Sequence, residues 1–187
     1  MSSAFYEKEE LLEMGFSSVG TDVAVSRLCS LYAISGSIGS GTRIDDFCVI
    51  KGAIDIGKKV HICSHCSISA VGGHVKIGDL CGIGVNNIFY TASDDMLSSA
   101  LCGPLVAKDH TALKTGRIAL GTGVALGGRN TVMPGTVVGD FSAFGLNSVL
   151  IGDFEAHAVY MNVNGKLRRI GKRDADKLND YASLELS

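Results

Sequence analysis

The sequence predicts an all-β solenoid, a left-handed parallel β-helix of six-residue repeats with short terminal helices and one long excursion loop. Aliphatic residues recur at every sixth position over two long stretches, a period that neither a helix nor an alternating strand shows. Glycine is abundant at 24 residues, whereas there are only 2 prolines and no tryptophan. Glycine suits a chain that turns often through positive φ angles.

The repeat runs in two blocks. The first block contains Ile38, Ile44, Ile50, Ile56, Ile62 and Ile68, and its register resumes at Ile77, Ile83 and Phe89. The second block contains Leu120, Leu126, Val132, Val138, Phe144 and Leu150. Three such repeats close one triangular coil, so residues three repeats apart should stack at about the 4.8 Å spacing of strands. We expect coils over residues 19–89 and 118–155, with these apolar side chains pointing inwards.

The whole chain, residues 1–187, is predicted to form one domain. Residues 1–16 are expected to form a helical cap, with a short helix from Phe5 to a stop at Gly15. Residues 156–187 are expected to form a tail with a second short helix over residues 172–186. Residues 90–117 break the repeat, and a long insertion in a regular solenoid is a loop that often carries function.

Composition and charge narrow the class of protein. The formal net charge of −2 gives no electrostatic footprint for nucleic acid or for acidic membranes. The first residues lack the layout of a signal peptide, and no apolar run is long enough to span a bilayer. We therefore expect a cytoplasmic protein whose six cysteines are reduced thiols.

The run HICSHC, residues 61–66, raises the question of a zinc site. The register argues against it, because Cys66 occupies the inward small position of its repeat. Cys48 and Cys29 occupy the same position one and two coils earlier. We interpret these residues as a ladder of buried thiols and expect no metal.

Several motifs resemble the bacterial hexapeptide-repeat acyltransferases. Residues 125–135, ALGGRNTVMPG, look like a signature of the maltose and galactoside O-acetyltransferases. Three other segments look like the acetyltransferases that act on nucleotide-linked amino sugars. They are the N-terminal segment with FY at 5–6, EELL at 9–12 and GF at 15–16, the run RIDDFC at 43–48, and the run YTASDD at 90–95. The resemblance covers residues 5–173. The repeat itself identifies a fold rather than a substrate.

The resemblance implies a homotrimer that transfers an acetyl group from acetyl-CoA to a sugar in O-antigen or other lipopolysaccharide biosynthesis. It implies that acetyl-CoA lies in a groove between two subunits. Residues expected beside its pantetheine arm are Gly127, Gly128, Gly145 and Ser148. Residues expected near its phosphates are Lys166, Arg168 and Arg169. Asp45 and Asp46 are candidates for contact with sugar hydroxyls.

Two departures from the family bear on the chemistry. The maltose and galactoside enzymes carry a catalytic histidine after the segment that matches residues 90–93, where this chain has Asp94 and Asp95. We take these two as the catalytic candidates, and their presence favours an amine acceptor, which needs less help from a base. His110 in the excursion loop is either a second base or an idle surface residue. Residues 162–166 also depart from the family pattern before the basic tail.

Alternatives from other classes remain at this point. A structural β-helix or an inactive family member would bind no acyl-CoA. A carbonic anhydrase of the same fold would need three histidine ligands around zinc, and the second block offers no matching triplet. An acceptor other than a sugar, such as an amino acid or an antibiotic, is a further alternative.

Overall fold

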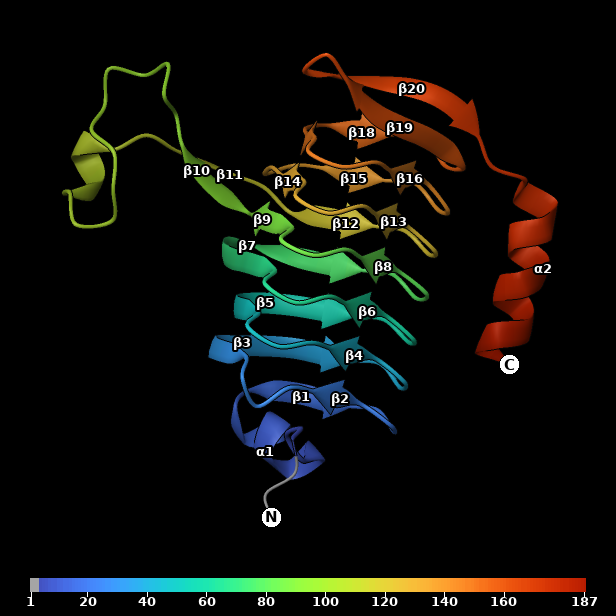
Figure 1. The fold of residues 1–187 in the computed structure, drawn as a ribbon. Coiled ribbons are helices and arrows are strands. Elements are labelled where there is room, and N and C mark those ends of the chain that lie inside the picture. The colour runs from blue at the N-terminus through green and yellow to red at the C-terminus, as the bar shows by residue number, and fades with distance from the viewer. Residues whose placement is uncertain (1–3) are drawn as a thin grey trace.

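The computed structural model describes residues 4–187, which form a parallel β-helix (Figure 1). Two sheets run along the solenoid, and their strands are parallel except for the last strand of the second sheet. The first contains β1 (Phe16–Val19), β3 (Ser30–Ile38), β5 (Val49–Ile56), β7 (Ser67–Ile77), β9 (Ile88–Tyr90), β12 (Ile118–Leu120), β14 (Thr131–Val132), β15 (Val137–Val138), β17 (Val149–Leu150) and β18 (Asp153–Phe154). The second contains β2 (Ala24–Val25), β4 (Arg43–Ile44), β6 (His61–Ile62), β8 (Gly82–Ile83), β13 (Ala125–Leu126), β16 (Ala143–Phe144), β19 (Ala158–Val163) and β20 (Lys166–Lys172).

The stacking follows the predicted register. Ile44 pairs with Ile62, three repeats later, and Leu126 pairs with Phe144 at the same interval. The fifteen apolar residues of the two blocks are all buried, with exposed fractions of at most 4%. Burying a large aliphatic side chain stabilises the fold by about 1.5–3 kcal/mol, so the repeat supplies most of the core. The left-handed β-helix expected from the sequence is confirmed.

Residues in the left-handed backbone conformation turn the chain at the corners of each coil. Residues other than glycine with positive φ include Asp22, Lys59, Leu80 and Phe141 at one corner, and Phe47, His65, Asn86, Arg129 and Asn147 at another. Among residues other than glycine, this backbone conformation is uncommon, and Asn, Asp and His adopt it most often. It persists here because hydrogen bonds between successive coils hold each corner, such as the bond from the backbone N–H of Lys59 to the carbonyl of Ser40.

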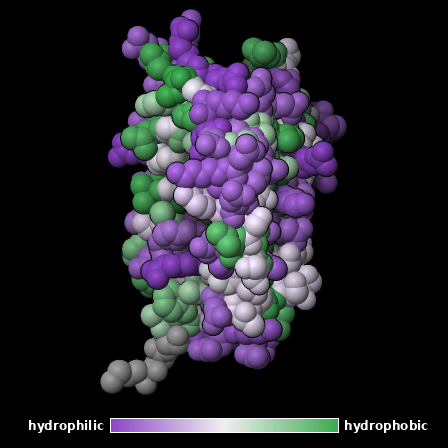
Figure 2. Space-filling model, turned by 90° about the vertical axis from the view of Figure 1, so that its right-hand side faces the viewer, coloured by the Kyte–Doolittle hydropathy of each residue, from purple (hydrophilic) through white to green (hydrophobic). Residues whose placement is uncertain are grey.

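The two terminal helices lie at different places on the solenoid. Helix α1 (Lys8–Glu13) is shorter than expected, because a capping box between Glu7 and Glu10 starts it at Lys8. Helix α2 (Ala175–Leu186) packs along the side of the coils, and Figure 2 shows that hydrophilic side chains predominate on this face. Within residues 4–187, no helix has the length and apolar character needed to cross a bilayer.

The tail contains a hairpin that the sequence analysis missed. Strand β19 continues the second sheet and then pairs antiparallel with β20. Asn164 and Gly165 form the turn, with φ values of 52° and 78°. An Asn-Gly pair with two positive φ angles is the favoured two-residue hairpin turn, so the sequence did carry the signal.

The excursion forms an arm that projects from the solenoid (Figure 1). Two antiparallel strands, β10 (Ala92–Asp94) and β11 (Leu113–Thr115), make its base, and a short 3-10 helix, η1 (Lys108–His110), lies near its tip. We refer to residues 92–115 as the arm. Its apolar side chains are largely exposed, and Leu97 and Leu105 reach 94% and 99%.

Candidate active site

The base of the arm is fixed to the solenoid by buried contacts. The hydroxyl of Thr91 is fully buried and donates to the backbone carbonyls of Ser69 (3.2 Å) and Val71 (3.1 Å). A Cβ atom on Gly73 would lie 2.7 Å from the Cβ atom of Thr91. The two segments therefore approach as closely as a glycine permits, and this holds Asp94 and Asp95 at a defined place beside the coil.

The two catalytic candidates differ in their surroundings. The Asp95 carboxylate accepts a hydrogen bond from the backbone N–H of Leu97 (3.1 Å) and lies 3.0 Å from the ammonium of Lys114. These contacts, with Lys114 the stronger, hold the pKa of Asp95 below its ordinary value. Asp94 is half-buried, and no side chain within residues 4–187 bonds to its carboxylate. Asp95 thus anchors the arm, whereas Asp94 is free to meet a substrate.

A buried column of side chains bonds to two of the glycines that were predicted beside pantetheine. Cys29, Cys48 and Cys66 are buried, which confirms the predicted ladder of thiols. Asn87 and Asn130 continue this column at 0% exposure. The Asn130 amide donates to the carbonyls of Gly127 (2.8 Å) and Gly145 (3.0 Å), and its oxygen accepts from the backbone N–H of Ser148 (2.8 Å).

The glycines predicted beside pantetheine have a structural reason to be glycine. A Cβ atom on Gly127 would lie 2.7 Å from the carbonyl oxygen of Gly145, so the coils could not stack at their present spacing. Gly127 and Gly145 are partly exposed, whereas Gly128 is buried beneath Val85 and Leu146. The Ser148 hydroxyl is also buried and faces the coil interior. Two of the four predicted positions are therefore accessible from outside this chain.

The three basic residues predicted near phosphate lie on the terminal hairpin strand β20. Lys166, Arg168 and Arg169 are exposed. The guanidinium of Arg169 lies 3.4 Å from the carboxylate of Glu155, so part of its charge is already balanced. Lys166 and Arg168 have no such partner among the described residues. They are the stronger candidates for an anion.

The two acidic residues predicted to contact sugar are both held by the protein. The Asp46 carboxylate accepts a hydrogen bond of 2.5 Å from Ser26 in the preceding coil, which is a structural role in a turn. Asp45 bonds to Arg43 (2.6 Å) and to His61 (2.8 Å). Partial burial acts to raise the pKa of Asp45, but these two bonds outweigh it and hold that pKa below its ordinary value.

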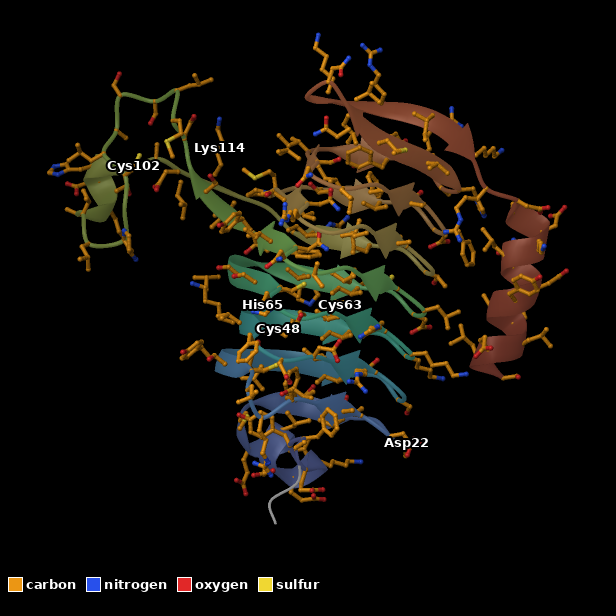
Figure 3. The ribbon with its side chains drawn as sticks, viewed as in Figure 1. Asp22, Cys48, Cys63, His65, Cys102 and Lys114 are labelled. Carbon is orange, nitrogen blue, oxygen red and sulfur yellow. The ribbon has the colours of Figure 1, made fainter. Side chains whose placement is uncertain are left out.

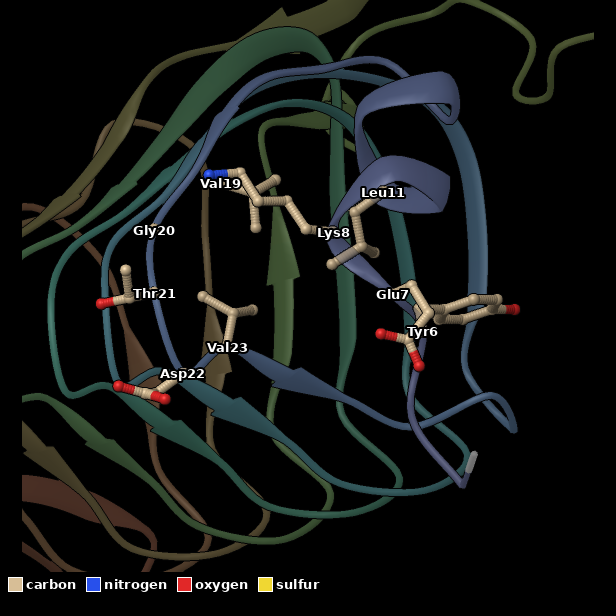
Figure 4. A pocket seen from close by; sticks show the side chains of 9 residues that line it. All are labelled: Tyr6, Glu7, Lys8, Leu11, Val19, Gly20, Thr21, Asp22 and Val23. Carbon is tan, nitrogen blue, oxygen red and sulfur yellow. The ribbon is translucent and has the colours of Figure 1, made fainter. Parts of the chain in front are cut away.

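The remaining features lie away from these residues. His110 is exposed at the tip of the arm, and its ring nitrogen lies 3.8 Å from Asp109. His74 pairs with Asp55 (2.9 Å), a contact that was not predicted. A cavity of about 320 Å³ lies between α1 and the first coil, at the opposite end of the solenoid from β20 (Figure 4). The cavity lies beneath the helical cap, and none of the predicted site residues lines it.

Comparison with known proteins gives two curated relatives. The chain is 33% identical over 167 residues to a dTDP-4-amino-4,6-dideoxy-D-glucose acyltransferase from Escherichia coli, covering 87% of this chain and 86% of that one. It is 29% identical to WbbJ of Escherichia coli K12, named for O-acetyl transfer in lipopolysaccharide biosynthesis, over 69% of this chain and 65% of that one. No protein-family model matches the chain.

Solved structures agree with these relatives. AntD from Bacillus cereus, an N-acyltransferase, matches over 100% of both chains with a TM-score of 0.86 and 31% identity, in complex with dTDP and 3-hydroxybutyryl-CoA. A variant of AntD in complex with dTDP-4-amino-4,6-dideoxyglucose and coenzyme A matches with a TM-score of 0.87 and 30% identity. A hexapeptide-repeat acetyltransferase from Vibrio cholerae shares the fold at 18% identity and a TM-score of 0.62, covering 89% of this chain and 76% of that one.

Fold and relatives together define the class, which is acyltransferases built on a left-handed β-helix. The chain belongs to the hexapeptide-repeat acyltransferase family, among the members that take an acyl group from coenzyme A and pass it to a sugar. This membership argues against the two alternatives of a purely structural β-helix and a carbonic anhydrase.

Proposed function

We propose that the chain transfers an acetyl group from acetyl-CoA to the amino group of a dTDP-linked 4-amino-4,6-dideoxy sugar, for use in O-antigen or another surface polysaccharide. The observation that carries this proposal is the 33% identity, over 87% of the chain, to an Escherichia coli acyltransferase with that acceptor. AntD, which binds the same sugar nucleotide together with coenzyme A, supports it.

The chemistry requires one nucleophile and one proton transfer. The amine nitrogen attacks the thioester carbonyl carbon, a C–N bond forms and the C–S bond breaks. The proton lost by the amine ends on the sulfur of coenzyme A. Asp94 is the residue that we assign to the acceptor amine, because its carboxylate has no partner of its own among the described residues. A carboxylate that accepts a hydrogen bond from the amine orients it and takes up its proton.

For the donor, we propose that pantetheine passes the accessible glycines, Gly127 and Gly145, where the coil surface carries no side chain. Lys166 and Arg168 would then bind the phosphates, since exposed cations without partners attract anions. We leave Gly128 and Ser148 out of the proposed contacts because this chain buries them.

We further propose a homotrimer in the cytoplasm. The arm exposes Met96, Leu97, Leu101 and Leu105 at 61–99%, and such an apolar surface on a projecting segment fits packing against another copy of the chain. All six cysteines are free thiols, which suits a reducing compartment that also contains acyl-CoA. Equilibrium sedimentation measures the trimer directly, and a monomer at working concentration would contradict it.

The test of function is a thiol-release assay with acetyl-CoA and two acceptors, dTDP-4-amino-4,6-dideoxyglucose and its analogue with a 4-hydroxyl. We expect release with the amine only. Asp94→Asn should lower kcat/KM by about 100-fold or more, and Asp95→Asn, which loses an anchor rather than a base, should cost less. Absence of both coenzyme A binding and thiol release would overturn the proposal, and release with the hydroxyl analogue alone would overturn the amine acceptor.

The proposed phosphate contact has a matched control on the same strand. Replacing Lys166 and Arg168 together by alanine should raise KM for acetyl-CoA about tenfold, the equivalent of about 1.4 kcal/mol, with little change in kcat. Lys172→Ala, an exposed cation at the other end of β20, should leave KM unchanged. Equal effects of the two changes would contradict the assignment.

A further inference from the structure

Three possible metal ligands converge on the second sheet, apart from Asp94 and the basic residues. Asp45 Oδ2 lies 2.8 Å from His61 Nε2, and His61 Nε2 lies 3.9 Å from Cys63 Sγ. All three ligand atoms lie within 4.8 Å of one another. Cys63 faces outwards, so the argument from register that places Cys66 in the core does not apply to it.

The fold itself brings these residues together. His61 and Cys63 flank the inward Ile62, so both side chains lie on the outer face of one coil. The backbone N–H of Asp45 bonds to the carbonyl of Ile62, which places Asp45 on the adjacent coil beside Cys63. The cluster therefore rests on the rigid hydrogen bonding of the solenoid rather than on a loop.

Neighbouring residues orient the cluster and leave one side of it open. Arg43 donates to Asp45 Oδ1 at 2.6 Å, so the other carboxylate oxygen, Oδ2, faces His61. In the next coil, Gly82 pairs with His61, and the carbonyl of Ile83 accepts a hydrogen bond from the backbone N–H of Cys63. A Cβ atom on Gly82 would meet nothing within 4 Å. The next coil therefore has no side chain at the position that pairs with His61.

We propose that Asp45, His61 and Cys63 form a Zn²⁺ site with three protein ligands and one open position. A tetrahedral zinc ion with bonds of about 2.0–2.3 Å holds its ligand atoms about 3.3–3.7 Å apart. The separations of 2.8 Å and 3.9 Å lie on either side of this range, so each needs a change of about half an ångström. The third pair, Asp45 Oδ2 and Cys63 Sγ, lies within 4.8 Å and needs an approach of at most about 1.3 Å, which side-chain rotation can supply.

The donor set selects the kind of metal. Imidazole, thiolate and carboxylate suit Zn²⁺ and its Co²⁺ substitute, whereas Mg²⁺ and Ca²⁺ prefer oxygen ligands throughout. Binding displaces the thiol proton of Cys63 into solvent and replaces the hydrogen bond between His61 and Asp45 by two bonds to the metal. Arg43 remains on the other carboxylate oxygen, in the outer position that commonly fixes a metal ligand.

The experiment uses the purified full chain, stripped with a chelator and titrated with ZnCl2 against a coloured zinc chelator. We expect one ion per chain with micromolar affinity. CoCl2 should give a thiolate-to-cobalt charge-transfer band in the near ultraviolet. Cys63→Ser should abolish the band and weaken zinc binding at least about tenfold, and His61→Gln should weaken it similarly.

Cys102→Ser provides the matched control, because Cys102 is an exposed thiol on the arm, far from Cys63 on the solenoid (Figure 3). It should leave both the band and the affinity unchanged. Circular dichroism confirms that each variant is folded. The proposal is overturned if the chain binds no zinc at about 100 µM, or if Cys63→Ser binds it as tightly as the unchanged chain. Neither measurement uses an acyl donor or acceptor, so its result is independent of the proposed transferase activity.

Discussion

Asn130→Ala tests whether the buried polar column holds the coils beneath the proposed coenzyme groove. The change removes three hydrogen bonds, two donated to the carbonyls of Gly127 and Gly145 and one accepted from Ser148. Gly127 keeps a second donor in Asn87, at 2.8 Å. The carbonyl of the half-buried Gly145 and the backbone N–H of the buried Ser148 therefore lose their partners.

The expected cost follows from these two orphaned groups. A buried polar group without a partner costs about 1–3 kcal/mol. Because Gly145 is only half-buried, its carbonyl falls at the low end of this range, so we expect a total loss of about 2–4 kcal/mol. A domain has a total stability of only about 5–15 kcal/mol, so this is a large fraction. For a chain of this size the loss corresponds to a fall in Tm of about 4–16 °C.

The assay is thermal unfolding followed by circular dichroism, with Asn179→Ala as the control. Asn179 is exposed on α2, where alanine is the better helix former, so that change should alter stability by less than about 0.5 kcal/mol. A loss below about 1 kcal/mol for Asn130→Ala would refute the reasoning, because it would mean that water or relaxation satisfies both orphaned groups.

Asn130→Asp separates hydrogen bonding from packing. The new carboxylate keeps the acceptor for Ser148 but faces the carbonyls of Gly127 and Gly145 without protons to donate. Burial among these oxygens raises the pKa of the introduced carboxyl in the folded state above its unfolded value. Stability is therefore greatest below the unfolded pKa and is lost as pH rises through the folded pKa. Asn130→Ala should show no such pH dependence.

Gly127→Ala should destabilise the fold by about 1–3 kcal/mol, whereas Gly82→Ala, where a Cβ atom meets nothing within 4 Å, should be tolerated, as urea unfolding can measure. A thiol reagent should label two of the six cysteines in the native protein and all six after denaturation, because the other four are buried out of its reach. The two expected to react are Cys63 and Cys102. Lys114→Ala should let the pKa of Asp95 rise towards its ordinary value, which a carboxyl carbon NMR titration follows, and an unchanged midpoint would contradict the ion pair.

The sequence by itself determined the solenoid. A six-residue apolar period places one side chain in the core at each repeat, and burial of those side chains is the main stabilising term. The helices and the position of the arm followed because they are the segments in which that period is absent. The motifs then indicated the family, which the relatives confirm.

Side-chain partners between coils were decided only by the tertiary structure. The sequence analysis assigned no role to Asn87, yet the backbone N–H of Asn130 bonds to its side chain across 43 positions, because the arm between them leaves the solenoid and returns. The same applies to Asp45, His61 and Cys63, since the period fixes which residues face outwards but not which outward side chains meet. Periodicity is a property of spacing along the chain, whereas contacts between coils also depend on insertions and side-chain rotamers. That is why the fold could be predicted from sequence, while the difference between a free Asp94 and an anchored Asp95 could not.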